Sequence, residues 1–172
     1  MSYYYFISSL PTLTFGEKPP MSTSDFIENS KQWLPKNDWQ DLNTIAKNSN
    51  ELKKNIALKW KNFNENLIYL LAAERATRLG KDQSPYLEKA GLVEPAVRSA
   101  VQDALKASDP SEAERILDKI KWNFLDDISI MHHFDFNIAL SYLLKLKILE
   151  RRATLDKKTG KDILNKSIQT KE

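Results

Sequence analysis

The stretch FDFNIALSYLLKLKILERRATLDKKTGKDIL, from Phe134 to Leu164, decides the fold of this chain. Leu, Ala, Lys, Glu and Arg dominate it, and all five residue types favour helices. Asp135 stands where an N-cap is expected, because its carboxylate would meet the positive end of the helix dipole. We therefore expect one helix from Asp135 to Lys158, roughly 36 Å long at 1.5 Å per residue.

The two halves of this expected helix differ. The first half is apolar on nearly all sides, and a helix of that kind belongs inside a protein. The second half, from Glu150 to Lys161, carries mainly charges and is expected in water or against a partner. Nothing else in the sequence explains the charged half. The apolar residues of the first half are Ile138, Ala139, Leu140, Tyr142, Leu143, Leu144, Leu146, Ile148 and Leu149.

A second long helix is predicted from Glu51 to Leu79. Its apolar residues recur at steps of three and four, the period of an amphipathic helix, and Gly80 follows as a natural C′ residue. With a length of roughly 42 Å it matches the first helix as an antiparallel partner. The apolar residues are Leu52, Ile56, Trp60, Phe63, Leu67, Leu70 and Leu71.

Shorter helices are expected around these two. The sequence Asp109-Pro110-Ser111-Glu112 combines a cap, a first-turn proline and an N3 glutamate, which is a strong helix start. Residues 81–91, with Pro85 and Gly91, are expected to form a loop. The other predicted helices begin at Ser22 or Ser24, at Asn37 or Asp38, and at Glu94-Pro95.

The N-terminal residues 2–13 are rich in aromatic side chains. They are compatible with a short strand, because aromatic residues favour strands, or with helical turns that end near Pro11. No second strand is predicted that could pair with them. We therefore expect a helix or an extended strap packed on a helical core.

Length and composition fit one all-α domain over residues 1–172. The apolar fraction of 41% and the charged fraction of 28% are ordinary for a soluble protein, and the net charge of +3 gives no strong case for nucleic acid. The absence of cysteine fits a reducing compartment, so a cytoplasmic protein is expected. The predicted parts are a strap with short helices (1–48), a long-helix bundle (49–158) and a charged tail helix (159–172).

Two groups of polar residues are candidates for a site. His132 and His133, with oxygen ligands from Asp126, Asp127 or Asp135, allow a metal or catalytic site of two histidines and a carboxylate, but adjacent histidines point to different sides of a helix. A polar helix–helix turn with capping groups is the favoured alternative.

The other group lies beside the apolar seam of the second long helix. Its arginines allow a structural clamp to Asp126, Asp127 or Glu150, or a phosphate site for which no Gly-rich loop lies nearby. We predict a structural polar cluster, comprising Glu74, Arg75, Arg78, Asp126, Asp127, His132, His133 and Asp135.

The basic residues near the C-terminus form a predicted partner-docking surface. Such a face can bind RNA or DNA electrostatically. Glu150, Asp156 and Asp162 dilute the positive charge, so a solvated face or a protein-docking surface is favoured. The predicted docking residues are Arg151, Arg152, Lys157, Lys158 and Lys161.

The sequence contains no P-loop, nucleophile elbow, metalloprotease helix or Rossmann fingerprint. It therefore gives no case for an enzyme. We predict no catalytic residue, no cofactor and no small-molecule substrate.

Several stretches together carry a family resemblance. They are SYYYFISSLPTLTFGEKPPMSTSDF (2–26), KWKNFNENLIYLLAAERATRLGKD (59–82), DPSEAERILDKIKWNFLDDI (109–128) and HHFDFNIALSYLLKLKILERRATLDKKTGKDIL (132–164). The chain resembles an uncharacterised bacterial family encoded in V-type (archaeal-type) ATPase operons. That family is similar to the all-α central-stalk subunit of these ATPases, which is named C in archaeal-type enzymes and d in eukaryotes.

The resemblance implies a non-catalytic role in ATP-driven ion transport. The implied partners are other V-type ATPase subunits, and the implied role is to join the rotor stalk to the membrane ring. The membrane would then be reached only peripherally, through these partners. The all-α central-stalk subunit is much longer and consists of three similar helical units, so this chain would be a reduced version of it.

Overall fold

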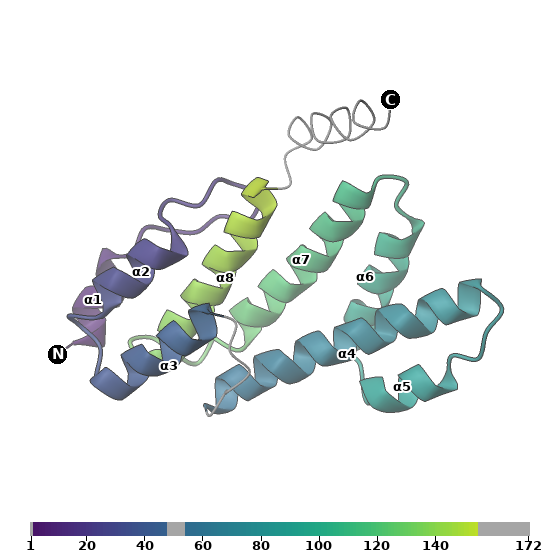
Figure 1. Ribbon diagram of the computed structural model, residues 1–172, viewed down its shortest axis with the longest axis horizontal. Helices are drawn as coiled ribbons and strands as arrows, with labels where there is room; N and C mark the ends of the chain where they lie inside the picture. The colour runs from purple at the N-terminus through teal and green to yellow at the C-terminus, as the bar shows by residue number, and fades with distance from the viewer. Residues whose placement is uncertain (1, 48–53, 155–172) are drawn as a thin grey trace, which may run out of the picture.

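The computed structural model describes residues 2–47 and 54–154, and every regular element in these ranges is an α-helix. This confirms the predicted all-α class. The helices are α1 (Tyr3–Ser9), α2 (Thr23–Ser30), α3 (Lys36–Ala46), α4 (Asn55–Arg78), α5 (Ser84–Ala90), α6 (Pro95–Lys106), α7 (Pro110–Asp127) and α8 (Phe136–Thr154). Figure 1 shows α1, α2, α3 and α8 gathered at one end and α5 and α6 at the other, with α4 and α7 reaching between them.

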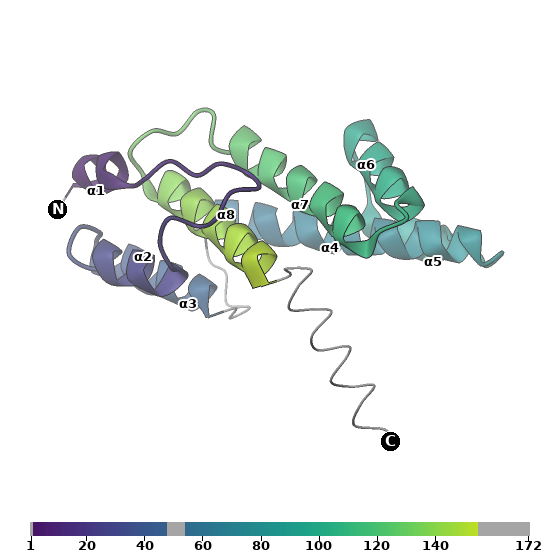
Figure 2. The ribbon, with the colours of Figure 1, turned by 90° about the horizontal axis from the view of Figure 1, so that it is seen from above.

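Two clusters of buried apolar side chains hold these helices together. The first cluster joins α1, α2, α3 and α8 to the start of α4 and the second half of α7. The second cluster joins the middle of α4 to α6 and the first half of α7, and its buried members are Leu67, Leu70, Val97, Val101, Ala104 and Leu117. Because α4 and α7 contribute to both clusters, these two helices connect the two ends of the elongated body (Figure 2).

Helix α8 lies at the centre of the first cluster. The Asp135 carboxylate caps it, with Oδ1 accepting from the backbone N–H groups of Asn137 (3.0 Å) and Ile138 (3.2 Å), which confirms the predicted N-cap. Its buried residues lie on several sides, and its helical neighbours are α7, α2, α3 and α1. A helix that is apolar nearly all round is thus covered by several helices, as the pattern requires.

The predicted antiparallel pairing of α4 with α8 is not confirmed. The buried residues in the middle of α4, such as Leu67 and Leu70, belong to the second cluster, and its main helical contacts are with α5 and α6. Near its start, Ile56 and Ala57 reach the first cluster. The physical reason is that shorter helices already cover the apolar surface of α8.

Polar side chains of α8 bind the ends of other helices. Glu150 accepts hydrogen bonds from the Thr23 backbone N–H (2.6 Å) and hydroxyl (2.5 Å), at the positive end of α2. Lys147 donates to the carbonyl oxygens of Ile45 (3.1 Å) and Ala46 (3.0 Å), at the negative end of α3. The charged half, from Glu150 onward, was expected to have no partner inside the chain. Glu150 does have one, so this expectation is wrong for the part of the charged half that belongs to α8.

The N-terminal residues form a helix followed by a strap, one of the predicted alternatives. Helix α1 ends before Pro11, and residues 10–22 run without regular structure to α2. The Phe6 ring is buried and lies 5.4 Å from the Phe26 ring. The Tyr142 hydroxyl donates to the Pro11 carbonyl oxygen at 2.8 Å, which fixes the strap on α8.

Local signals explain several helix ends. Ser22 and Asp25 form a capping box at the start of α2, which decides between the two predicted caps. Asp109 caps α7, as predicted, by accepting from the backbone N–H of Ser111 at 2.9 Å. At the end of α4, Gly80 has a φ of +65°, and the backbone N–H of Lys81 donates to the Ala76 carbonyl oxygen at 2.9 Å, as in a Schellman motif.

The prediction of a loop over residues 81–91 is wrong in part, because α5 forms within this range. Pro85 lies in its first turn, where the missing N–H costs nothing, and Gly91 stops it with a φ of +62°. These two residues mark the start and stop of a helix here. None of the helices in the described residues is both long enough and apolar enough to cross a membrane.

Candidate functional site

One candidate site is a groove bounded by α4, α6, α7 and residues 128–132. Its volume is about 760 Å³, within the range of small-molecule sites. The lining residues are Lys59, Asn62, Phe63, Asn66, Leu67, Leu92, Val93, Glu94, Ala96, Val97, Ile120, Asn123, Phe124, Asp127, Ile128, Met131 and His132. We call this feature the groove.

The base of the groove is apolar and rigidly held. Leu67 of α4 and Val97 of α6 are buried members of the second cluster. The Phe63 and Phe124 rings stack with centroids 4.0 Å apart and planes 13° from parallel. Because helix-borne side chains with fixed neighbours form this surface, the groove is preformed.

The edge of the groove exposes two large apolar side chains. Leu92, which follows the turn at Gly91, is fully exposed at 104%. Met131, between α7 and α8, is 86% exposed. A single exposed leucine is ordinary. Two large exposed apolar side chains beside one apolar groove indicate an interaction site, because a partner that covers them removes apolar surface from water.

Charged groups around the groove have no ion-pair partner among the described residues. Glu94 and Asp127 contribute carboxylates and Lys59 contributes an ammonium group. The ion pairs found in those residues involve none of the three. With two negative groups against one positive group, the charge of the groove is opposite in sign to that of the chain, which is +3.

One of the predicted polar residues, His132, also lines the groove. Its Nδ1 lies 2.5 Å from Asp135 Oδ2, and the Asn137 amide nitrogen lies 2.9 Å from the same ring nitrogen. Because Asp135 also caps α8, this group acts as the predicted polar turn with capping functions. The described residues contain no group of three or more His, Cys, Asp or Glu side chains that could hold a metal ion.

The other predicted polar residues are distributed along the molecule. Glu74 accepts from the Gln102 amide at 3.3 Å, and Arg78 donates to the Leu105 carbonyl oxygen, so both bind α6. Arg75 and His133 are exposed. Asp126 pairs with Lys145 of α8 at 2.5 Å, whereas Asp127 lines the groove. The predicted arginine clamp from α4 to Asp126, Asp127 or Glu150 is therefore not formed.

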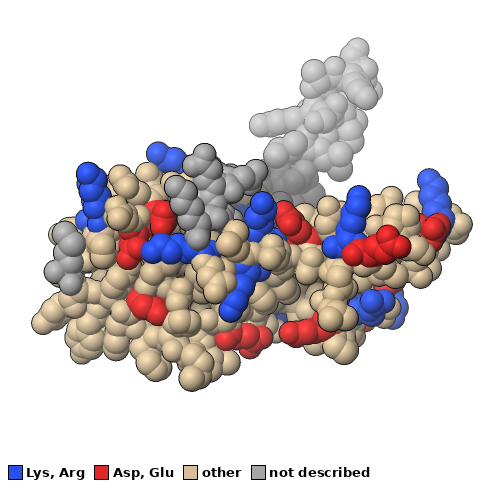
Figure 3. Space-filling view, turned by 90° about the horizontal axis from the view of Figure 1, so that it is seen from below, with Lys and Arg blue, Asp and Glu red and all other residues tan. Residues whose placement is uncertain are grey.

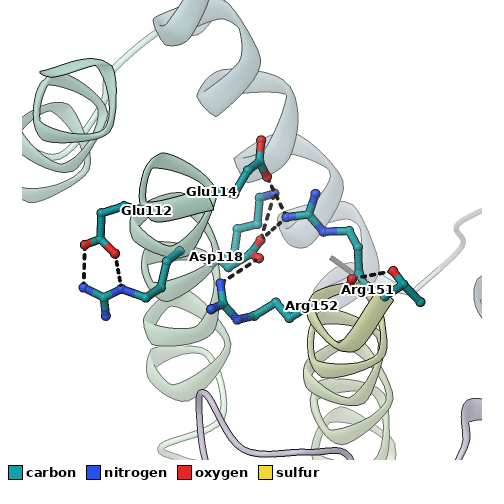
Figure 4. Close-up of polar contacts among 8 residues, drawn as sticks. Glu112, Glu114, Asp118, Arg151 and Arg152 are labelled. Atoms are coloured by element: carbon teal, nitrogen blue, oxygen red, sulfur yellow. Dashed lines mark hydrogen bonds and ion pairs between the residues drawn. The ribbon is translucent and has the colours of Figure 1, made fainter. Parts of the chain in front are cut away.

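A clamp does exist, and it uses two predicted docking residues (Figure 4). Arg151 of α8 lies 2.6 Å from Asp118 Oδ1 and 2.8 Å from Glu114 Oε2, both on α7. Arg152 Nη1 lies 3.7 Å from Asp118 Oδ2, and Lys121 Nζ lies 3.7 Å from Oδ1. We call these residues the α7–α8 clamp. Their predicted role in partner docking stays a prediction, and Lys157, Lys158 and Lys161 lie outside the described residues.

Asp118 was missed by sequence reasoning. Its carboxylate is fully buried, and Oδ2 accepts no hydrogen bond from the described residues. The signal was available, because Asp118 precedes Trp122 and Leu125 by four and seven residues and so shares their buried face. A carboxylate on the apolar face of a helix indicates a basic partner on the neighbouring helix.

Comparison with known families matches residues 46–171 to the family described as "Protein of unknown function (DUF2764)". The chain belongs to this family. No curated protein and no solved structure matches the chain.

The family match spans both candidate features. Every lining residue of the groove and every residue of the α7–α8 clamp falls within 46–171, whereas α1 and α2 precede this range. The groove and the clamp therefore lie in the part of the chain that matches the family.

Proposed function

We propose that the protein is a non-catalytic interaction subunit or accessory factor of a V-type ATPase, coupling the central rotor stalk to the membrane ring. The structural support is the preformed groove with Leu92 and Met131 exposed at its edge. Burying one such side chain contributes about 2 kcal/mol, so a partner that covers both gains a substantial part of a typical binding energy. The V-type ATPase context is supported by the sequence resemblance.

The helical architecture is compatible with a coupling role. Helices α4 and α7 take part in both buried clusters and connect the two ends of the molecule. Helix α8 is joined to α7 by the α7–α8 clamp. A part that transmits force between two partners requires such continuous, cross-braced elements. In this proposal the protein is cytoplasmic, reaches the inner membrane only through its partners, and has no cofactor or small-molecule substrate.

The alternative role in binding RNA or DNA has less support. Arg151 and Arg152, the described part of the predicted basic surface, form ion pairs with carboxylates of α7. Phosphate contacts would have to replace these pairs. On the face shown in Figure 3, positive and negative side chains are interspersed, which is unlike a continuous basic stripe.

Co-purification from the native cell tests the proposal. Tagged protein purified in mild detergent should bring V-type ATPase subunits with it. Met131→Asp and Leu92→Asp should lose these subunits, because each places a charge on the apolar edge of the groove. Ile68→Asp is the matched control, since Ile68 on α4 is 63% exposed and does not line the groove. Absence of every ATPase subunit from the wild-type sample would contradict the proposal.

A further inference from the structure

We infer that the groove binds a basic amphipathic helix from a partner protein. The inference rests on the proposed function for the existence of a protein partner and adds the chemistry of the segment that binds. It follows from the shape of the groove, its apolar base and edge, and the sign of its free charges.

Helical walls make a helix the best-fitting form of the bound segment. The groove lies between α4, α6 and α7, and helices pack on helices by placing side-chain ridges into grooves. An extended peptide that docks by strand addition needs a sheet edge, and residues 2–47 and 54–154 contain no strand. A helix in an apolar groove is anchored by side chains at i, i+3 or i+4, and i+7.

The apolar surfaces specify the side chains that face the groove. The Phe63–Phe124 stack and Leu67 offer an apolar base, and the exposed Leu92 and Met131 side chains can cover the apolar face of a bound helix. Methionine is flexible and polarizable, which suits a contact that adapts to its partner. We therefore expect leucine-like or aromatic anchors on the inner face of the bound helix.

The charges specify the flanks of the bound helix. Glu94 and Asp127 are both free of ion pairs within the described residues, and Lys59 is the single positive side chain that lines the groove in those residues. A segment with lysine or arginine beside its apolar face would pair with the two carboxylates. An acidic segment would place like charges together, so the groove discriminates against it.

Synthetic peptides provide the test. One fluorescent peptide of about 15 residues, long enough to form a helix, carries leucines at i, i+3, i+4 and i+7 and lysines at the flanks. A second peptide has every lysine replaced by glutamate, and a third is a scrambled form of the first. Fluorescence anisotropy against the full-length protein gives the Kd of each.

The lysine peptide should bind saturably, and the glutamate peptide should bind about tenfold more weakly, as expected when two edge ion pairs become like-charge contacts. Met131→Asp and Leu92→Asp should each weaken the lysine peptide about tenfold or more, whereas Ile68→Asp should leave its Kd unchanged. The double variant Glu94→Gln, Asp127→Asn should bring the two peptides to similar affinity. Thermal unfolding confirms that each variant is folded.

Several results would overturn the inference: no saturable binding, equal binding of the scrambled peptide, or an unchanged Kd in both groove variants. If ATPase subunits are still captured through the groove while the lysine peptide fails, the proposed function stands and the basic helix is wrong. If the peptide binds at the groove and the ATPase is absent from the co-purified material, the inference that the groove binds a basic helix is supported and the proposed function is wrong.

Discussion

The two buried clusters are held together by different kinds of contact. In the first cluster, polar bonds join residues far apart in the chain, such as Glu150 with Thr23 and Tyr142 with Pro11. The second cluster is built mainly from helices adjacent in sequence, with α4 against α5 and α6 against α7. Leu67 and Val97 of the second cluster also line the groove. The first cluster therefore joins the N-terminal residues to α8, and the second cluster forms the base of the groove.

The largest expected loss of stability comes from a substitution in the first cluster. Leu143 is fully buried at the centre of α8, and Leu143→Ala should cost about 3–5 kcal/mol of unfolding free energy, since surrounding helices restrict collapse of the cavity. Leu67→Ala, at the base of the groove, should cost less, about 2–3 kcal/mol, because water can reach the vacated space. Chemical denaturation of both variants measures the difference. Equal losses would contradict the comparison.

The α7–α8 clamp should give the next largest effect. Asp118→Asn removes the buried charge that faces two arginines, and we expect a loss of about 1–3 kcal/mol, reduced by solvent screening of the half-exposed Arg151. The matched control is Glu112→Gln, which breaks an exposed pair with Arg115 on the same helix and should change stability much less than Asp118→Asn does. Similar values for the two variants would show that the clamp is dispensable.

A pH-dependent contribution comes from Asp38, which joins α1 and α3 to Lys54. Burial raises the pKa of Asp38, but hydrogen bonds from Lys54 (2.7 Å) and Tyr3 (2.6 Å) outweigh this and hold the pKa below its ordinary value of 3.8. The stabilisation is therefore complete above pH 3.8 and is lost as the pH falls through the lower folded-state pKa.

Tyr3→Phe tests this contribution. It should raise the pKa of Asp38 and cost about 0.5–1.5 kcal/mol at neutral pH, because one hydrogen bond to a carboxylate is lost. NMR titration of the Asp38 carboxyl gives the pKa, and thermal unfolding gives the stability. An unchanged pKa would mean that Lys54 alone holds the carboxylate.

The smallest expected effect on stability lies at the edge of the groove. Met131→Asp should change the unfolding free energy by about 0.5 kcal/mol or less, since the side chain is exposed. It should nevertheless remove partner binding. A large loss of stability in this variant would show that Met131 belongs to the structural part of the molecule.

Sequence reasoning predicted the local features well. The caps at Ser22, Asp109 and Asp135 and the stop at Gly80 were recognisable, because capping depends on residues within one helical turn. The apolar run of α8 also predicted a central buried helix. These features depend on near neighbours in the chain.

The pairing of helices was not predictable in the same way. The length of α4 suggested that it would pack against α8. Packing depends instead on which apolar helix surfaces are complementary, and α8 packs mainly against α7, α2 and α3. The α7–α8 clamp joins residues 33 positions apart, and the groove combines segments from three helices. Periodicity within one helix contains no information on such partners. The placement of Asp118 on an apolar face was the one available clue.

The bond between Thr23 and Glu150, 127 positions apart, has a consequence for synthesis on the ribosome. Phe6 and Phe26 emerge early, but their buried surroundings include α8, which is translated last among the described helices. The second cluster extends along the chain only to Ile120, so all of its residues are translated before α8. The nascent chain should therefore fold first at the second cluster. During that time Phe6 and Phe26 lack their buried surroundings, and exposed apolar side chains of this kind make a folding intermediate prone to aggregation.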